Sequence, residues 1–369
     1  MSDNYGAVWA IDEGRFPEDR SDADRLRFVL QYAILAPSGH NGQPWRFHVD
    51  GDALHVYADR TRALPTIDPN DRELLISCGA TVHLVRTALE HFGYHPQVDI
   101  LPDQSADADL LATVHTGPRT EACTPRDLFD AVQRRHSNRR PYESRAVSEA
   151  DLSRLQSAAA VEDAWVLTIT DRSTIAAAAE LIGEGDRLKW RETVFRHELA
   201  ERIIPNRGAR RDGMPGYAFG IPGPLSRLAP FVVRRVDLGR FRARSDQALA
   251  LATPVLAVIG TQRDDPPSWV AAGQAMSRVL LRATADGLAT SFLSQAIEVP
   301  ELRDRLAGLI HHDGYPQLLL RVGYSRRQTR PTPRRPVREV SSTSRPLAAA
   351  VNGLGSADGG SLARNAGTP

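Results

Sequence analysis

A short loop at residues 36–47 concentrates hydrogen-bonding side chains: Ser38, Asn41 and Gln43 lie among two prolines and two glycines. Hydroxyl and amide groups both donate and accept hydrogen bonds, and glycines let a backbone approach a ligand closely. A plain connection between a helix and a strand would not need this combination. The composition of the loop therefore predicts a ligand-binding segment.

A second chemically rich segment follows nearly one hundred residues later, at 134–142, with the sequence R-R-H-S-N-R-R-P-Y. Guanidinium groups make paired, charge-assisted hydrogen bonds to phosphate oxygens, so this arginine motif could bind a phosphate. Taken alone, the motif fits a solvated, charged helix end better. Arg334 and Arg335 form another pair, for which a phosphate contact and a basic tail are equally good interpretations.

The elements around the loop can be read from periodicity. Apolar residues at helical spacing predict a helix before the loop, which Pro37 must end: Leu26, Val29, Leu30, Ala33 and Ile34. After the loop, Trp45, Phe47 and Val49 alternate with polar residues, as in a strand. The loop is therefore expected to sit between two rigid elements.

An internal repeat organises the chain. Residues 79–93 and 273–287 are helical patterns of equal length bracketed by glycines, and both read as buried helices closed by a terminal glycine. Segments 30–33 and 155–158 resemble each other and precede Trp45 and Trp165, but the second copy is five residues shorter because it lacks the loop. Chance similarity between helical segments is the alternative.

The pattern A-P-S-x-x-N-x-Q-P-W at 36–45 resembles the flavin loop of the nitroreductase superfamily of FMN-binding oxidoreductases, and R-R-x-S-x-R at 134–139 is similar to its phosphate motif. The loop-first order and the fused halves look most like the Acg-like subfamily, up to about residue 340. The resemblance implies an α+β, nitroreductase-like fold, in which two fused related halves mimic the homodimer of the family. Each half would be a mainly antiparallel sheet packed with helices.

The expected organisation is a polar N-terminal arm at 1–21, a first half at 22–117 with the flavin loop, and a second half at 126–340 with the arginine motif. An insertion at about 186–240, rich in Arg, Gly and Pro, fits neither repeat and reads as a lid or a disordered excursion. Its aromatic residues, Phe231 among them, favour packing of the insertion against another part of the protein. The tail at 341–369 is rich in Ser, Ala and Gly and is expected to be disordered.

By resemblance, Arg135 and Ser137 would bind the FMN phosphate, and Arg139 would lie at the N1 and O2 edge of the ring, where reduction places negative charge. The segment with Thr290, Ser291 and Leu293 would meet the N5 edge. The full set of expected cofactor-binding residues is Pro37, Ser38, Gly39, Asn41, Gln43, Arg134, Arg135, His136, Ser137, Arg139, Thr290, Ser291, Leu293, Arg334 and Arg335. No residue is predicted to be catalytic, because the flavin carries the chemistry.

Composition excludes several other functions. The formal net charge is +1, and the basic run at 326–338 lacks interleaved aromatic residues, so nucleic acid is not an expected partner. Two cysteines, Cys78 and Cys123, cannot form a zinc site or a disulfide framework, and no metal is predicted. The apolar run at 249–260 is short and interrupted, and the N-terminus is polar. We expect a cytoplasmic protein with no membrane partner.

The predicted function is therefore an FMN-dependent NAD(P)H oxidoreductase that reduces nitroaromatics, quinones or similar small acceptors through flavin N5. The alternative is an FMN-binding or FMN-sequestering protein whose lid closes the flavin site. Because the sequence holds one flavin loop and one arginine motif, a monomer with an internal pseudo-dimer and one complete site is expected.

Overall fold

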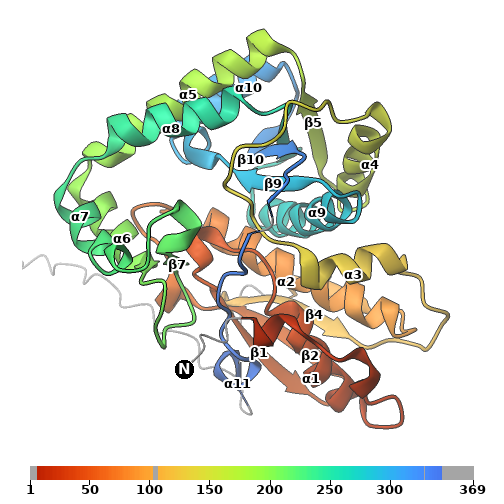
Figure 1. Cartoon of the computed structure of the whole chain (residues 1–369). Coiled ribbons are helices and arrows are strands. Elements are labelled where there is room, and N and C mark those ends of the chain that lie inside the picture. Colours follow the sequence, from red (N-terminus) through yellow and green to blue (C-terminus); the bar gives the residue numbers. More distant parts are fainter. Residues whose placement is uncertain (1–5, 103–106, 328, 343–369) are drawn as a thin grey trace, which may run out of the picture.

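The computed structural model describes residues 6–102, 107–327 and 329–342. Two sheet-containing halves lie one above the other in Figure 1, joined by helices at their junction and by a long arm at one side. One apolar core runs through both halves, from Leu26 in the first to Leu320 in the second. The fold is α+β with mainly antiparallel sheets, as the sequence predicted.

The first half is built from one long helix against a mixed sheet. Its elements are α1 (Asp22–Ala33), β1 (Trp45–Asp50), β2 (Ala53–Ala58), α2 (Arg72–His91), β3 (Gln97–Ile100) and β4 (Leu110–His115). With β11 (Ser341–Ser342) from the C-terminal segment, the strand order is β11-β1-β2-β4-β3, and only the β1–β11 pair is parallel among these neighbours. Helix α1 begins after the Ser21 cap and ends at Ala33, four residues before Pro37, close to the expected position.

The second half repeats this plan around a four-stranded antiparallel sheet. Its elements are α3 (Arg126–Arg134), α4 (Glu149–Ala160), β5 (Trp165–Ile169), β8 (Val255–Thr261), α9 (Pro266–Ala285), β9 (Ala289–Phe292), α10 (Pro300–Ile310) and β10 (Tyr315–Gly323). The strand order β5-β8-β10-β9 matches β1-β2-β4-β3 strand for strand. The helix before the first strand, α1 or α4, has twelve residues in each half. This shared topology supports the interpretation that the halves arose by duplication.

The two longest matching helices, α2 and α9, cross at a pair of glycines. A Cβ atom on Gly79 would lie 2.2 Å from the carbonyl oxygen of Val270, and one on Gly273 would lie 2.0 Å from that of Ile76. The contact is reciprocal, because each glycine meets the carbonyl three residues before the other. Each helix begins seven residues before its glycine, so the glycines do not mark the helix starts as the sequence pattern suggested. Their role is to permit a close crossing of the two helices.

The chain between β5 and β8 leaves the second half as an arm and returns. Its elements are α5 (Arg172–Arg191), α6 (Thr193–Arg202), β6 (Ile203–Ile204), β7 (Met214–Pro215), α7 (Ala229–Arg235) and α8 (Gly239–Leu251). Figure 1 shows α5 and α8 running outward together, with α6, α7 and β7 bending down beside the first half. The predicted insertion at 186–240 thus starts inside α5 and ends at the start of α8.

Both ends of the described chain pack onto the halves. Trp9 in the N-terminal arm is buried, and α11 (Val337–Val340) leads into β11 (Ser341–Ser342), which pairs with β1. The remainder of the predicted tail, 343–369, lies outside the described residues. Cys78 and Cys123 are both free. Among the described residues, no helix has the length and apolarity needed to cross a bilayer, and no cluster of metal-ligating side chains occurs.

Candidate functional site

The loop between α1 and β1 has a strained backbone. His40, Asn41 and Gln43 have φ angles of 50°, 56° and 53°, in the left-handed region that side chains rarely adopt. The Oγ atom of Ser38 accepts a hydrogen bond from the Gln43 amide at 3.0 Å, which closes the loop on itself. Strain at about 1 kcal/mol or more per residue persists where surrounding contacts hold it, and such positions cluster at ligand sites.

The start of the loop is anchored to α2. Pro37 is buried directly after α1, and the Gly39 amide donates to Ser77 Oγ at 3.3 Å. The Ser77 hydroxyl in turn donates to the Glu73 carbonyl at 2.7 Å. The first turns of α2 therefore fix the position of this part of the loop.

The arginine motif lies beside β9 in the second half. Ser137 forms a parallel bridge with Thr290, and the Asn138 amide donates to the Thr290 carbonyl at 2.8 Å. The Tyr142 hydroxyl donates to the Asn138 carbonyl at 2.9 Å. The end of α3 and the start of β9 are thus tied together, although more than 150 residues separate them in sequence.

The flavin loop and the arginines meet at one backbone carbonyl. The Leu35 oxygen accepts hydrogen bonds from Nη2 of Arg135 and Nη2 of Arg334, both at 3.3 Å. Arg334 also donates to the Ala36 carbonyl at 3.1 Å and to Asn41 Oδ1 at 2.8 Å. Residues from the first half, the second half and the C-terminal segment therefore converge on one point.

This point carries buried positive charge without a matching carboxylate. Arg135 is 4% exposed and Arg334 is 3% exposed, and within the described part of the chain neither forms an ion pair. Burial lowers the pKa of Arg135 to about 10, and burial followed by repulsion from Arg135 lowers the pKa of Arg334. The Nε atom of Arg334 has no hydrogen-bond partner among the described residues. An anion is the chemical complement of this cluster.

The aromatic rings of Trp9 and His136 pack against each other beside these arginines. The rings meet edge to face with centroids 4.5 Å apart, and the Cζ atom of Arg334 lies 4.8 Å from the centre of the Trp9 ring. The Trp9 indole donates to the Thr332 carbonyl at 3.1 Å. Burial, reinforced by Arg135, lowers the pKa of His136 to about 3, so the imidazole is neutral near pH 7. Sequence reasoning missed Trp9, because a lone tryptophan in a polar arm carries no pattern.

Arg139 and Arg321 extend the positive charge toward the second sheet. Arg139 has no ion pair in the described residues, and its Cζ atom lies 5.5 Å from the centre of the Phe219 ring in the insertion. Arg321 on β10 is 1% exposed, faces Ser291 across the β9–β10 pair, and lies 4.4 Å from the centre of the Tyr142 ring. The signal for Arg321 in the sequence is a charged residue inside the apolar run of β10.

Three expected residues are engaged elsewhere. Arg134 is exposed and donates to the Asp130 carbonyl of its own helix at 3.2 Å. Arg335 lies 3.8 Å from Asp59 in an ion pair. The Leu293 amide donates to the Leu319 carbonyl at 2.9 Å. The structure therefore places Arg334, and not Arg335, beside Arg135.

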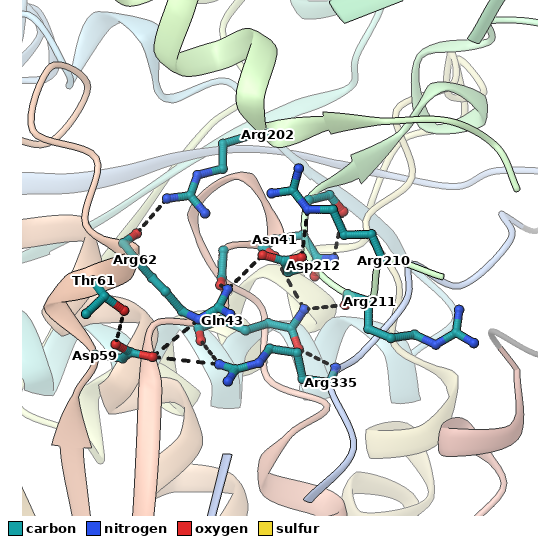
Figure 2. A network of polar contacts seen from close by, with 12 residues as sticks. Asn41, Gln43, Asp59, Thr61, Arg62, Arg202, Arg210, Arg211, Asp212 and Arg335 are labelled. Atoms are coloured by element: carbon teal, nitrogen blue, oxygen red, sulfur yellow. Dashed lines mark hydrogen bonds and ion pairs between the residues drawn. The ribbon is translucent and has the colours of Figure 1, made fainter. Parts of the chain in front are cut away.

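The insertion is fastened to the flavin loop by a polar network, which Figure 2 shows. Asn41 exchanges two hydrogen bonds with Gly213, at 2.8 Å and 3.0 Å. The Gln43 side chain donates to the Arg211 carbonyl at 2.8 Å and accepts from the Arg335 amide at 2.8 Å. Both loop amides expected to bind a ligand are thus committed to the insertion and the C-terminal segment.

Further contacts join the insertion to residues 62–67. We call these contacts, together with those to Asn41 and Gln43, the clamp. Arg62 forms an ion pair with Asp212 at 2.7 Å. Glu198 on α6 accepts from the backbone amides of Thr66 and Ile67 at 3.0 Å and 2.9 Å. Leu64 and Ile67 also join the buried apolar cluster of the insertion: Trp190, Phe195, Leu199, Ala200, Ile203, Met214, Ala229 and Val233. The insertion therefore packs firmly against the first half.

His40 lies where the loop faces the insertion. Burial is the main cause that lowers its pKa to about 3, and the charges of Lys189, Arg139 and Arg202 act in the same direction. Its Nδ1 atom has no hydrogen-bond partner among the described residues. The imidazole is therefore a neutral polar group near pH 7, within reach of the positive charge of Arg139.

Comparison with known proteins finds relatives over nearly the whole chain, although no family model matches it. The chain is 32% identical over 329 residues to the Mycobacterium tuberculosis protein named "Putative NAD(P)H nitroreductase Rv3131", with 87% of this chain and 91% of that protein covered. It is 28% identical over 336 residues to "Putative NAD(P)H nitroreductase acg" of the same organism, with 88% and 97% covered. Among solved structures, the chain is similar to the nitroreductase NfnB from sphigopyxis sp. strain HMH, which is described as FMN and NADPH-dependent. The sequence identity is 18%, the match covers 58% of this chain and 96% of that chain, and the TM-score is 0.38.

Proposed function

Because the chain belongs to the nitroreductase family, we propose that it is an FMN-binding flavoprotein that oxidises NAD(P)H and reduces a nitroaromatic, a quinone or a similar small acceptor. One observation carries the proposal: Arg135 and Arg334 are buried, lack carboxylate partners in the described structure, and converge on the Leu35 carbonyl. The doubly charged phosphate of FMN would supply the missing negative charge.

The residues present fit FMN in chemical type. Arg135 and Arg334 would hold the phosphate, with Ser137, which pairs with Thr290 of β9, as a further hydroxyl donor. Pro37, Ser38 and Asn41 would line the ribityl chain and ring from the first half. Arg139, half-buried and without an ion pair in the described residues, would face the N1 and O2 edge of the ring.

The chemistry of hydride transfer belongs to FMN, which when bound accepts a hydride from NAD(P)H at N5 and passes electrons on to the acceptor. The chain would contribute binding, orientation and electrostatics. A fixed positive charge at Arg139 would stabilise the negative charge that develops on the ring when FMN is reduced. The proposed mechanism therefore needs no acid–base pair from the protein.

FMN sequestration is the second candidate, and the clamp favours it. The insertion contacts the flavin loop through Asn41 and Gln43, and its Met214 and Phe219 lie next to Arg139. A closed insertion at this place would restrict entry of a second substrate. A reductase must open here, whereas a store can stay closed.

Anaerobic stopped-flow reduction of the FMN-loaded wild-type protein separates the two candidates. We expect NADH or NADPH to bleach the flavin band, more slowly than dithionite does because dithionite is small, and a nitroaromatic or quinone to restore the band. Bleaching by dithionite but not by either nicotinamide would contradict the reductase proposal and leave storage. Both nucleotides should be measured, since the sequence does not indicate a preference.

A further inference from the structure

Residues 225–244, which we call the arm tip, carry an unusual number of exposed apolar side chains. Figure 1 shows α7 at the outer end of the arm, away from both sheets. Of eleven large hydrophobic residues exposed in the described structure, six lie in this segment: Leu225, Leu228, Phe231, Val232, Val236 and Phe241. The Phe231 side chain, expected from the sequence to pack onto something, is 58% exposed, and Phe241 is 69% exposed.

The exposed apolar residues lie on one side of the helical part of the tip. Leu225, Leu228 and Phe231 recur every three residues through the turn Leu225–Arg227 and helix α7. Ala229 and Val233, on the other side, are buried in the apolar cluster of the insertion. The tip therefore has two apolar faces, one packed against the insertion and one facing outward. An ordinary surface helix has only the packed apolar face.

Positive charge surrounds the outward face. The arm tip holds six arginines and one aspartate, while the whole chain has a formal net charge of only +1. Arg242 pairs with Asp246, but the other five arginines are exposed and form no ion pair within the described residues: Arg227, Arg234, Arg235, Arg240 and Arg244. The Cζ atom of Arg235 lies 5.0 Å from the centre of the Phe231 ring, so charge and apolar surface adjoin.

We propose that the arm tip docks on the surface of a bilayer that contains anionic lipids. Exposed leucine and phenylalanine side chains enter the headgroup boundary, and flanking arginines bind lipid phosphates, which is the usual composition of an interfacial segment. Symmetric pairing of two copies through this face would bring the arginines of both copies together, and such like-charge contact opposes it. Docking of this kind departs from the sequence-based expectation of no membrane partner, and it requires no membrane-spanning helix.

Co-sedimentation with vesicles tests the proposal. The purified full-length protein is mixed with vesicles of phosphatidylcholine alone or with about one third phosphatidylglycerol, at low and high salt. We expect binding to the anionic vesicles only, weakened by salt. Arg234→Gln/Arg240→Gln should weaken binding about thirtyfold, since each arginine near an anionic surface contributes a factor of about five. Phe231→Ser/Phe241→Ser should also reduce it strongly.

Matched controls alter exposed residues elsewhere on the protein. Arg119→Gln/Arg263→Gln removes two other exposed arginines, and Val161→Ser removes another exposed apolar side chain. These variants should bind as the wild type does, and circular dichroism checks that all variants are folded. No binding of the wild type to anionic vesicles, equal binding by the arm-tip variants, or a dimer that the arm-tip variants abolish would overturn the proposal. The assay does not depend on FMN, so its failure leaves the proposed function untouched.

Discussion

Replacing Arg135 with methionine should weaken FMN binding by about 1.5–3 kcal/mol, a loss of roughly 10–150-fold in affinity, because a charge-assisted hydrogen bond to the phosphate is left unmade. Among the described residues the guanidinium donates only to the Leu35 carbonyl, and burial lowers its pKa to about 10. An apolar side chain of similar length avoids that desolvation. The same variant should therefore raise the Tm of the FMN-free protein.

The neighbouring Arg134 provides the control. It is exposed and, within the described part of the chain, its side chain donates only to a carbonyl of its own helix, so Arg134→Met should change neither FMN affinity nor Tm. Titration with riboflavin, which lacks the phosphate, should give similar affinities for the wild type and Arg135→Met. If Arg135→Met lost riboflavin and FMN affinity equally, Arg135 would support the fold of the site and would not contact the phosphate.

Loosening the clamp should speed reduction of the flavin by NAD(P)H. Glu198→Ala removes the carboxylate that accepts from the Thr66 and Ile67 amides. Charge-assisted hydrogen bonds of this kind contribute about 1.5–3 kcal/mol, so the fraction of molecules with an open insertion should rise roughly tenfold or more. If opening limits access, the rate constant for flavin bleaching in the stopped-flow experiment rises by the same factor.

Glu201→Ala is the matched control, because Glu201 is an exposed carboxylate on the same helix and its side chain forms no ion pair in the described residues. That variant should react at the wild-type rate. Dithionite should reduce all three proteins equally, which separates access from a change in the flavin itself. Equal nicotinamide rates for the wild type and Glu198→Ala would mean that this part of the insertion does not control access.

The sequence was sufficient to predict the elements that hold the site. Local backbone chemistry predicts a helix that ends before Pro37, a strand that begins at Trp45, and glycines at two helix ends, Gly93 and Gly287. The structure has these elements. The role of Gly79 and Gly273 was misread, because a glycine at a helix crossing and a glycine at a helix boundary look the same in one sequence. Only the reciprocal contacts with Val270 and Ile76 distinguish them.

The choice between Arg334 and Arg335 could not be made from the sequence. Outside a regular helix or strand, the sequence does not fix the directions of two adjacent side chains, and tertiary contacts decide which one enters the site. Arg335 pairs with Asp59, and Arg334 donates a hydrogen bond to the Leu35 carbonyl. Asp59 and Leu35 both lie far from the two arginines in sequence. Likewise, the outward face of the arm tip depends on which side of α7 the insertion buries.

Measurement of FMN stoichiometry tests the central claim, that the two fused halves form one flavin site. The purified protein is saturated with FMN and passed through a desalting column, and the flavin absorbance is compared with the protein concentration. We predict one FMN per chain, because the described structure brings one flavin loop and one arginine motif together at Leu35. Two tightly bound FMN molecules per chain, or none, would contradict the account.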